Sequence, residues 1–243
     1  MLTDLIGGAV LVTLATGLGA LSTFYISDIC KSKYTLLLAF SAGVMMFTSL
    51  EMISQAHHEI GHVLTAVGLL CGMLLIFLSE KLLPHIHQQI KKTELPTSKK
   101  KAALIVGTIA IHNIPEGFAI AAAFAGSVPL GWFTATSMAI QDAPEGALIS
   151  APLICYGLDK KRAVGFGILS GVVEGLAAVI GYLFLTVVLS LVPFALAFSA
   201  GAMMYVVLVE IMPDVLREKE KYVGSLVFII GIVIAFLLAG LFS

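Results

Sequence analysis

The sequence predicts an all-α integral membrane protein with eight transmembrane helices. Hydrophobic residues make up 59% of the chain, charged residues only 12%, and the mean hydropathy is +1.03. A soluble domain is normally about 45 to 50% apolar, so this composition argues against one. The sequence also lacks the strict alternation of apolar and polar residues that is typical of a membrane β-barrel.

Windows of about 20 apolar residues, the length that crosses the hydrocarbon core of a bilayer, place the helices. The start of the chain lacks a basic region, so we expect the first apolar run to remain as a span and not to be cleaved as a signal peptide. The longest polar linker is 85–101. We predict spans at 5–26, 34–56, 62–84, 102–125, 129–151, 162–189, 193–213 and 222–242.

The basic residues orient these spans. All 14 Lys and Arg residues fall after the first, third, fifth and seventh spans, and therefore on one side of the membrane. The positive-inside rule makes that side cytoplasmic, so both termini and the turns on their side face outward. We expect a multi-pass protein of the plasma (inner) membrane, with the lipid bilayer and no nucleic acid as its partner.

An internal repeat supports a transporter. Leu38–Phe47 reads LAFSAGVMMF and Leu196–Tyr205 reads LAFSAGAMMY, with eight identities in ten. The two copies lie in the second and seventh spans, which cross in opposite directions. Inverted repeats of this kind build many secondary transporters, which hold their substrate near the midplane. The alternative is that small-residue helix faces converge because both must pack closely.

Two near-copies of a polar motif interrupt the fourth and fifth spans, 29 positions apart: HNIPEG at 112–117 and QDAPEG at 141–146. Each motif lies about 18–20 Å from the turn that joins the two spans, at a rise of 1.5 Å per residue. A charged residue at this depth costs about 3 kcal/mol or more and marks a site by default. The acids within spans must therefore be protonated, hydrated or bound to a cation: Glu51, Glu116, Asp142, Glu145, Glu174 and Glu210.

The spacing within the motifs predicts two metal centres. His112 and Glu116 are four residues apart and share a helix face, and the second motif repeats this pattern. One centre would use His112 and Gln141 with the glutamates, and the other Asn113 and Asp142 with the same glutamates. In that arrangement Glu116 and Glu145 bridge the two centres.

Further residues fit this hypothesis. Pro115 and Pro144 remove helical hydrogen bonds where the polar residues gather. Glu174, on a glycine-rich face of the sixth span, would bring the carboxylate charge to −4, which two divalent ions would cancel. The imidazole favours Zn²⁺ over Mg²⁺ or Ca²⁺. Met45 is either a thioether ligand or a packing residue.

Other interpretations of the same residues stay open. The kinked helices could serve packing alone, with their acids protonated. The chain could be an intramembrane metal-dependent hydrolase, although it has no H-E-x-x-H motif, or a proton-coupled carrier of an organic cation. His57, His58 and His62 on the outer side could gather cations, and His85 and His87 in the basic loop could bind metal, or both sets could be ordinary polar segments.

The paired motifs, the SAGVMM segment of the second span and the glutamate of the sixth span resemble the ZIP (Zrt/Irt-like) metal transporter family, and the QDAPEG variant resembles its GufA-like bacterial branch. The resemblance implies a 3+2+3 arrangement of helices, a homodimer and uptake of Zn²⁺ into the cytoplasm, with Cd²⁺, Fe²⁺ and Mn²⁺ as related substrates. It also implies a binuclear site between the fourth, fifth and sixth spans. The ligand positions that match are Met45, His112, Asn113, Glu116, Gln141, Asp142, Glu145 and Glu174.

Overall fold

The chain folds into helices. The computed structural model describes residues 1–25, 31–91, 97–155, 157–217 and 221–242, and the side chains among them other than 31–34, 83–91 and 97–111. Within these ranges every regular element is a helix. The α-helices are α1 (Leu2–Ser22), α2 (Lys31–Lys91), α3 (Thr97–Gly126), α4 (Val128–Cys155), α5 (Lys160–Val187), α6 (Val192–Tyr205), α7 (Met212–Arg217) and α8 (Lys221–Phe242). A 3₁₀ turn, η1 (Leu189–Leu191), precedes α6, and a π-helical segment, η2 (Val206–Ile211), joins α6 to α7.

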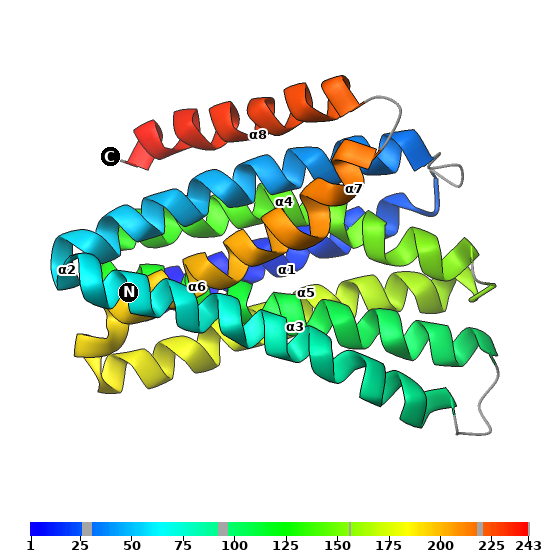
Figure 1. The fold of residues 1–243 in the computed structure, drawn as a ribbon, viewed down its shortest axis with the longest axis horizontal. Helices are drawn as coiled ribbons and strands as arrows, with labels where there is room; N and C mark the ends of the chain where they lie inside the picture. Colours follow the sequence, from blue (N-terminus) through cyan, green and yellow to red (C-terminus); the bar gives the residue numbers. More distant parts are fainter. Residues whose placement is uncertain (26–30, 92–96, 156, 218–220, 243) are drawn as a thin grey trace.

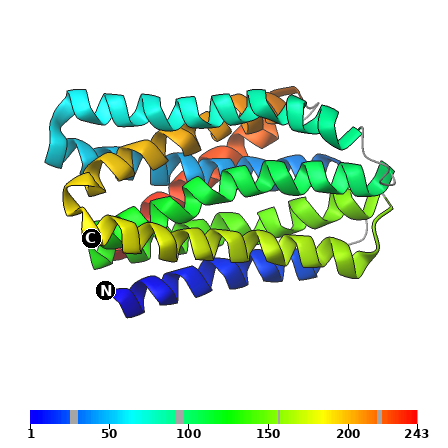
Figure 2. The same cartoon turned by 90° about the horizontal axis from the view of Figure 1, so that it is seen from below.

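The helix α2 is two helices joined at Gly61, where the chain reverses direction (Figure 1). Gly61 has φ 73° and ψ 175°, a left-handed conformation that a residue with a Cβ rarely adopts. The first part of α2 runs to one end of the bundle and the second part returns alongside α6. Both chain termini also lie at the end where α2 reverses, as two perpendicular views show (Figures 1 and 2). We call this the termini end.

Among the residues that the structure describes, five helical segments are long and apolar enough to cross a membrane by length and composition, so the chain is a helical membrane protein. They are Leu2–Ser22, Thr35–Leu82, Lys160–Val187, Leu189–Arg217 and Lys221–Phe242. Helix α4 is not among them, and its position explains why. It carries Gln141, Asp142 and Glu145, and most of its residues are buried by other helices. A helix that is shielded from lipid in this way can carry polar side chains.

Close backbone contacts hold α1 against α4. A methyl group at Gly146 would overlap the carbonyl oxygen of Thr16, and one at Gly19 would overlap the carbonyl oxygen of Ala143. Small residues allow this approach, which is how helices associate in membranes without a hydrophobic driving force. On the other side of α1, the hydroxyl of Thr13 donates to the carbonyl of Gly171 in α5 at 2.9 Å. Helix α1 therefore fixes the relative positions of α4 and α5.

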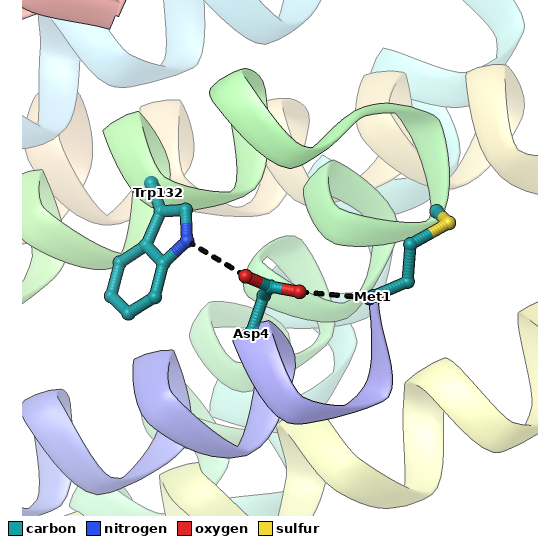
Figure 3. Close-up of polar contacts among 3 residues, drawn as sticks. All are labelled: Met1, Asp4 and Trp132. Carbon is teal, nitrogen blue, oxygen red and sulfur yellow. Dashed lines mark hydrogen bonds and ion pairs between the residues drawn. The ribbon is translucent and has the colours of Figure 1, made fainter.

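A polar contact near the termini end adds to this packing (Figure 3). The indole Nε1 of Trp132, in α4, donates to Asp4 Oδ1 in α1 at 3.4 Å. The other oxygen of this carboxylate lies 2.8 Å from the amino group of Met1. The Trp132 ring also packs edge to face against Phe124 of α3, with ring centroids 5.7 Å apart. The α3–α4 turn is thus anchored to the start of α1.

Candidate metal centre

Helices α3 and α4 bring three carboxylates together inside the bundle. Glu116, Asp142 and Glu145 each offer an oxygen atom, and these atoms lie within 4.8 Å of one another. Glu116 is 3% exposed and Asp142 1% exposed, while Glu145 is half-buried. Three acids at this separation repel one another strongly in a medium of low dielectric constant. A cation between them would turn this repulsion into attraction.

The sequence places these groups through the turn between the two helices. Helix α3 ends at Gly126 and α4 begins at Val128, so the helices run back along each other. Glu116 and Gln141 lie about 16 and 20 Å from this turn along their helices, at 1.5 Å per residue, and therefore at a similar depth. Pro115 and Pro144 lie inside the two helices beside the acids. Each proline removes a backbone donor and so frees a carbonyl oxygen within the bundle.

Several buried oxygen atoms in and beside this cluster have no hydrogen-bond donor in the described part of the chain. Gln141 Nε2 donates to Glu116 Oε1 at 3.2 Å. Among the described residues, Glu116 Oε2, Gln141 Oε1 and both oxygens of Asp142 have no hydrogen-bond partner although they are buried. Buried polar atoms are normally paired, and leaving one unpaired costs about 1–3 kcal/mol. The atoms left unpaired are all acceptors, which is the type that a metal ion satisfies.

Helix α5 supplies a fourth acid. Glu174 is completely buried, and neither of its oxygens has a hydrogen-bond partner within the described part of the chain. Its carboxyl group lies next to that of Asp142. A methyl group at Gly117 of α3 would overlap the backbone oxygen of Glu174, so the glycine of the first motif lets α5 approach. Glu174 extends the cluster on its α5 side.

Two other predicted ligands take different positions. Asn113 is 4% exposed, and its side-chain Nδ2 donates to the carbonyl oxygen of Ser170 in α5 at 3.4 Å. Its Oδ1 is the atom that could face a cation. Met45 of α2 is 2% exposed and belongs to the main hydrophobic core. Packing accounts for its burial, and its role as a ligand stays a prediction.

His112 has a partner that the sequence analysis did not assign to it. Its Nε2 lies 2.9 Å from Oε1 of Glu210, and both side chains are partly exposed, at 18% and 24%. His112 also lies within electrostatic reach of Glu145. Glu210 belongs to η2, and π-helical segments occur frequently at functional sites. The imidazole therefore stands between the carboxylate cluster and an acid of a separate helix.

A second pair of side chains continues from Glu210. Glu80 of α2 lies next to Glu210, and its Oε2 accepts a hydrogen bond of 2.7 Å from the hydroxyl of Tyr205. Sequence reasoning named Glu210 as an acid within a span and overlooked Glu80. The signal available was the position of Tyr205 at the end of the second repeat copy, where the first copy has Phe47. A buried hydroxyl group normally has a hydrogen-bond partner, so Tyr205 indicated that a polar residue lies nearby.

Five of the six histidines lie outside the two polar motifs. His58 and His62 are four residues apart, but the break at Gly61 separates them, so they do not share a helical face. Instead the rings of His57 and His62 stack with centroids 4.0 Å apart, and His58 lies 5.8 Å from His57. A cation at this turn stays a prediction. The side chains of His85 and His87 lie outside the described residues.

Carboxylate oxygens, an amide and a nearby imidazole together form a donor set for a borderline divalent ion such as Zn²⁺. The unpaired oxygen atoms of Glu116, Gln141 and Asp142 are of the type that would bind such an ion. A helical membrane protein with buried, mutually repelling acids between its helices belongs, as a class, to the proteins that move cations across membranes.

Comparison with known proteins identifies the family. The family model described as ZIP zinc transporter matches residues 91–239, more than half of the chain. The zinc transporter ZupT of Chlorobaculum parvum is 32% identical over 89% of this chain and 90% of its own length. The zinc transporter GufA of Myxococcus xanthus is 32% identical over 86% of this chain and 89% of its own length. An Arabidopsis thaliana relative is 26% identical over 85% of this chain but 33% of its own length. The chain belongs to the ZIP zinc transporter family.

This membership confirms the resemblance given by the paired motifs. It also decides between two of the alternatives, because the family consists of transporters and the chain is therefore a transporter of metal ions and not a hydrolase. The names of these relatives give zinc as their substrate.

Proposed function

We propose that the chain carries divalent metal ions, with Zn²⁺ as the main substrate, into the cytoplasm through a binuclear site between α3, α4 and α5. The observation that supports this most is the group formed by Glu116, Asp142 and Glu145, whose oxygens lie within 4.8 Å of one another. Family membership supports zinc as the ion. Cd²⁺, Fe²⁺ and Mn²⁺ have similar ligand preferences and are the further substrates that we propose.

The proposed site has two metal positions, bridged by Glu116 and Glu145. His112 and Gln141 would complete the first position. Asn113, Asp142 and Glu174 would complete the second, and Met45 would add a thioether from α2. Glu116 would have to give up its bond from Gln141 Nε2 when a metal binds, or use its free Oε2.

We also propose eight crossings with both termini outside. The reversal at Gly61 divides α2 into two crossings, and α6, η2 and α7 together form one. Both termini lie at one end. In the sequence all 14 Lys and Arg residues fall near the boundaries after the first, third, fifth and seventh crossings, on the opposite side, which the positive-inside rule makes cytoplasmic. The proposal includes the 3+2+3 order of these crossings and a homodimer in the plasma membrane, which the family resemblance implies.

Movement of one helix group against another would expose the site to each side in turn. Helices α1, α3, α4 and α5 hold most of the proposed ligands, and tight glycine contacts bind them together. The hydroxyl of Ser41 in α2, which donates to the backbone oxygen of Gln141 at 3.0 Å, and the contact between His112 and Glu210 link this group to the rest. Side-chain packing, such as that of Phe47 on Phe133 and of Phe118 on Phe198, also crosses this boundary. Side-chain contacts are easier to exchange than interlocked backbones.

Zinc uptake into proteoliposomes tests the proposal. The purified chain should take up ⁶⁵Zn²⁺, and the double variant Glu116→Ala with Glu145→Ala should not, because it removes both bridging ligands. The double variant must keep the elution volume of the wild type in size-exclusion chromatography. Uptake by the double variant at the rate of the wild type would overturn the proposed site.

A further inference from the structure

The two copies of the repeat make equivalent contacts with their neighbours. Phe40 and Phe198 hold the same place in the repeat, 158 residues apart. A methyl group at Gly231 of α8 would overlap the carbonyl oxygen of Phe40, and one at Gly72 of α2 would overlap the carbonyl oxygen of Phe198. Gly72 and Gly231 are therefore equivalent as well, and the second part of α2 corresponds to α8.

An aromatic pair confirms this correspondence. Phe47 and Tyr205 end the two repeat copies. Phe47 packs edge to face on Phe236 with centroids 5.8 Å apart, and Tyr205 packs in the same way on Phe77 at 6.5 Å. Phe77 follows Gly72 by five residues, and Phe236 follows Gly231 by five. The equivalence thus extends over both helix pairs.

The π-helical segment η2 shifts the register after Tyr205. A π-helical turn contains one residue more than an α-helical turn for the same advance along the axis. The fourth residue after Phe47, Glu51, therefore corresponds to the fifth residue after Tyr205, which is Glu210. A direct count from the repeat would pair Glu51 with Val209 and hide the relation between the two acids.

The two equivalent acids have different surroundings. Glu210 contacts His112 of the first motif. Glu51 instead lines a cavity of about 480 Å³ near the termini end, together with Gln55, Phe47 and Phe236. Phe47 also packs on Phe133 of α4, with centroids 6.3 Å apart, one helical turn deeper along α2 than Glu51. These rings lie between the cavity and the level of the paired motifs.

The equivalent serines of the two repeat copies also differ in their contacts. Here the serine of the first copy bonds to a motif, and within the described residues that of the second does not. Ser41 donates to the backbone oxygen of Gln141, whereas its equivalent, Ser199, is buried without a hydrogen-bond partner in the described part of the chain. Gln141 holds the place in the second motif that His112 holds in the first. One repeat copy therefore contacts the motifs through its serine and the other through its acid.

The equivalence of Glu51 and Glu210 is the basis for a role of Glu51. This role depends on the proposed function. We propose that Glu51 is the divalent-cation-binding residue of the outer entrance, and that in the opposite arrangement of the two helix groups it approaches Gln141 as Glu210 approaches His112 here. In the present arrangement it lines the cavity at the termini end, on the side from which a cation from outside would arrive.

Uptake kinetics test this role. Glu51→Gln should raise the half-saturating zinc concentration at least fivefold, and Glu51→Asp, which keeps the carboxylate, should fall between the variant and the wild type. Asp159→Asn removes the same charge from an exposed position before α5, away from the cavity and the histidine turn, and should stay within twofold of the wild type. Equal kinetics for Glu51→Gln and the wild type would overturn the inference and leave the proposed function intact.

A labelling experiment tests the role of Glu51 even if no zinc is transported. In a chain with its three cysteines replaced by serine, Glu51→Cys should react with a membrane-impermeant thiol reagent from the side of the termini, and Glu210→Cys from the opposite side. Zinc should slow the labelling of Glu51→Cys but not that of Thr3→Cys, at an exposed position near the start of α1. Labelling of positions 51 and 210 from the same side, or an unreactive Glu51→Cys, would contradict the inference. Absence of zinc uptake by the wild type would contradict the proposed function instead.

Discussion

His112 Nε2 lies 2.9 Å from Glu210 Oε1, and this contact joins the first polar motif of α3 to the π-helical segment η2. The imidazole of His112 therefore lies between the carboxylate cluster and Glu210. Glu80 lies next to Glu210, so acids continue from the cluster toward the end of the bundle opposite the termini. An ion that leaves the cluster past His112 would meet Glu210 next.

Glu210→Gln should therefore slow transport more than it weakens binding. We expect zinc uptake to fall about tenfold, which corresponds to about 1.4 kcal/mol, while zinc binding at equilibrium changes by less than about threefold. Asp214→Asn is the matched control, because Asp214 is an exposed acid four residues further on. Equal effects of the two variants on uptake would show that Glu210 acts only through its charge at a distance.

Removing charge from the cluster should stabilise the protein when zinc is absent. The double variant Glu116→Gln with Asp142→Asn removes two buried acids that have no cationic partner among the described side chains, and we expect about 1–4 kcal/mol of added stability. Zinc at 100 times its dissociation constant should stabilise the wild type by about 2.7 kcal/mol and this variant hardly at all. Thermal unfolding in detergent, with and without zinc, measures both effects. A zinc-free variant that melts below the wild type would contradict the account.

The contact between α1 and α4 can be tested through its glycine. Gly146→Ala places a methyl group against the carbonyl oxygen of Thr16, so the helices must move apart. We expect a loss of about 1–3 kcal/mol in the free energy of unfolding.

Gly165→Ala is the control for this substitution, because a methyl group at Gly165 of α5 meets no atom within 4 Å. It should leave stability unchanged or raise it by up to about 1 kcal/mol, through the higher helix propensity of alanine. If both variants lost the same stability, the close contact would not be the cause.

Tyr205→Phe removes the hydroxyl that donates to Glu80 at 2.7 Å. The ring should still fit, because Phe47 fills the equivalent place in the other repeat copy. We expect a loss of about 1.5–3 kcal/mol, typical of a hydrogen bond to a charged group, in unfolding experiments at neutral pH. A variant as stable as the wild type would mean that water replaces the hydroxyl at Glu80.

The sequence predicted the family, the helical class and the residues that gather at the centre. The spacing of Glu116 and Glu145 within two copies of one motif, on helices joined by a short turn, determines that these acids meet. That inference needs only the rise and period of a helix.

The contacts of His112, Tyr205 and Gly61 were not predictable in this way. His112 meets Glu210 because η2 inserts a residue after the repeat, and a π-helical turn has no clear sequence signal. The bond from Tyr205 to Glu80 joins residues 125 positions apart. The stacking of His57 on His62 depends on the left-handed conformation of Gly61, whereas a continuous helix would have paired His58 with His62.

Anomalous diffraction from crystals soaked in zinc would show whether the buried acids of α3, α4 and α5 hold divalent ions between them. We expect two zinc peaks about 3.5–4 Å apart, bridged by Glu116 and Glu145, with oxygen ligands at about 2.0–2.2 Å. Zinc found elsewhere in the protein, with no peak within bonding distance of Glu116, Asp142 or Glu145, would contradict the proposed site.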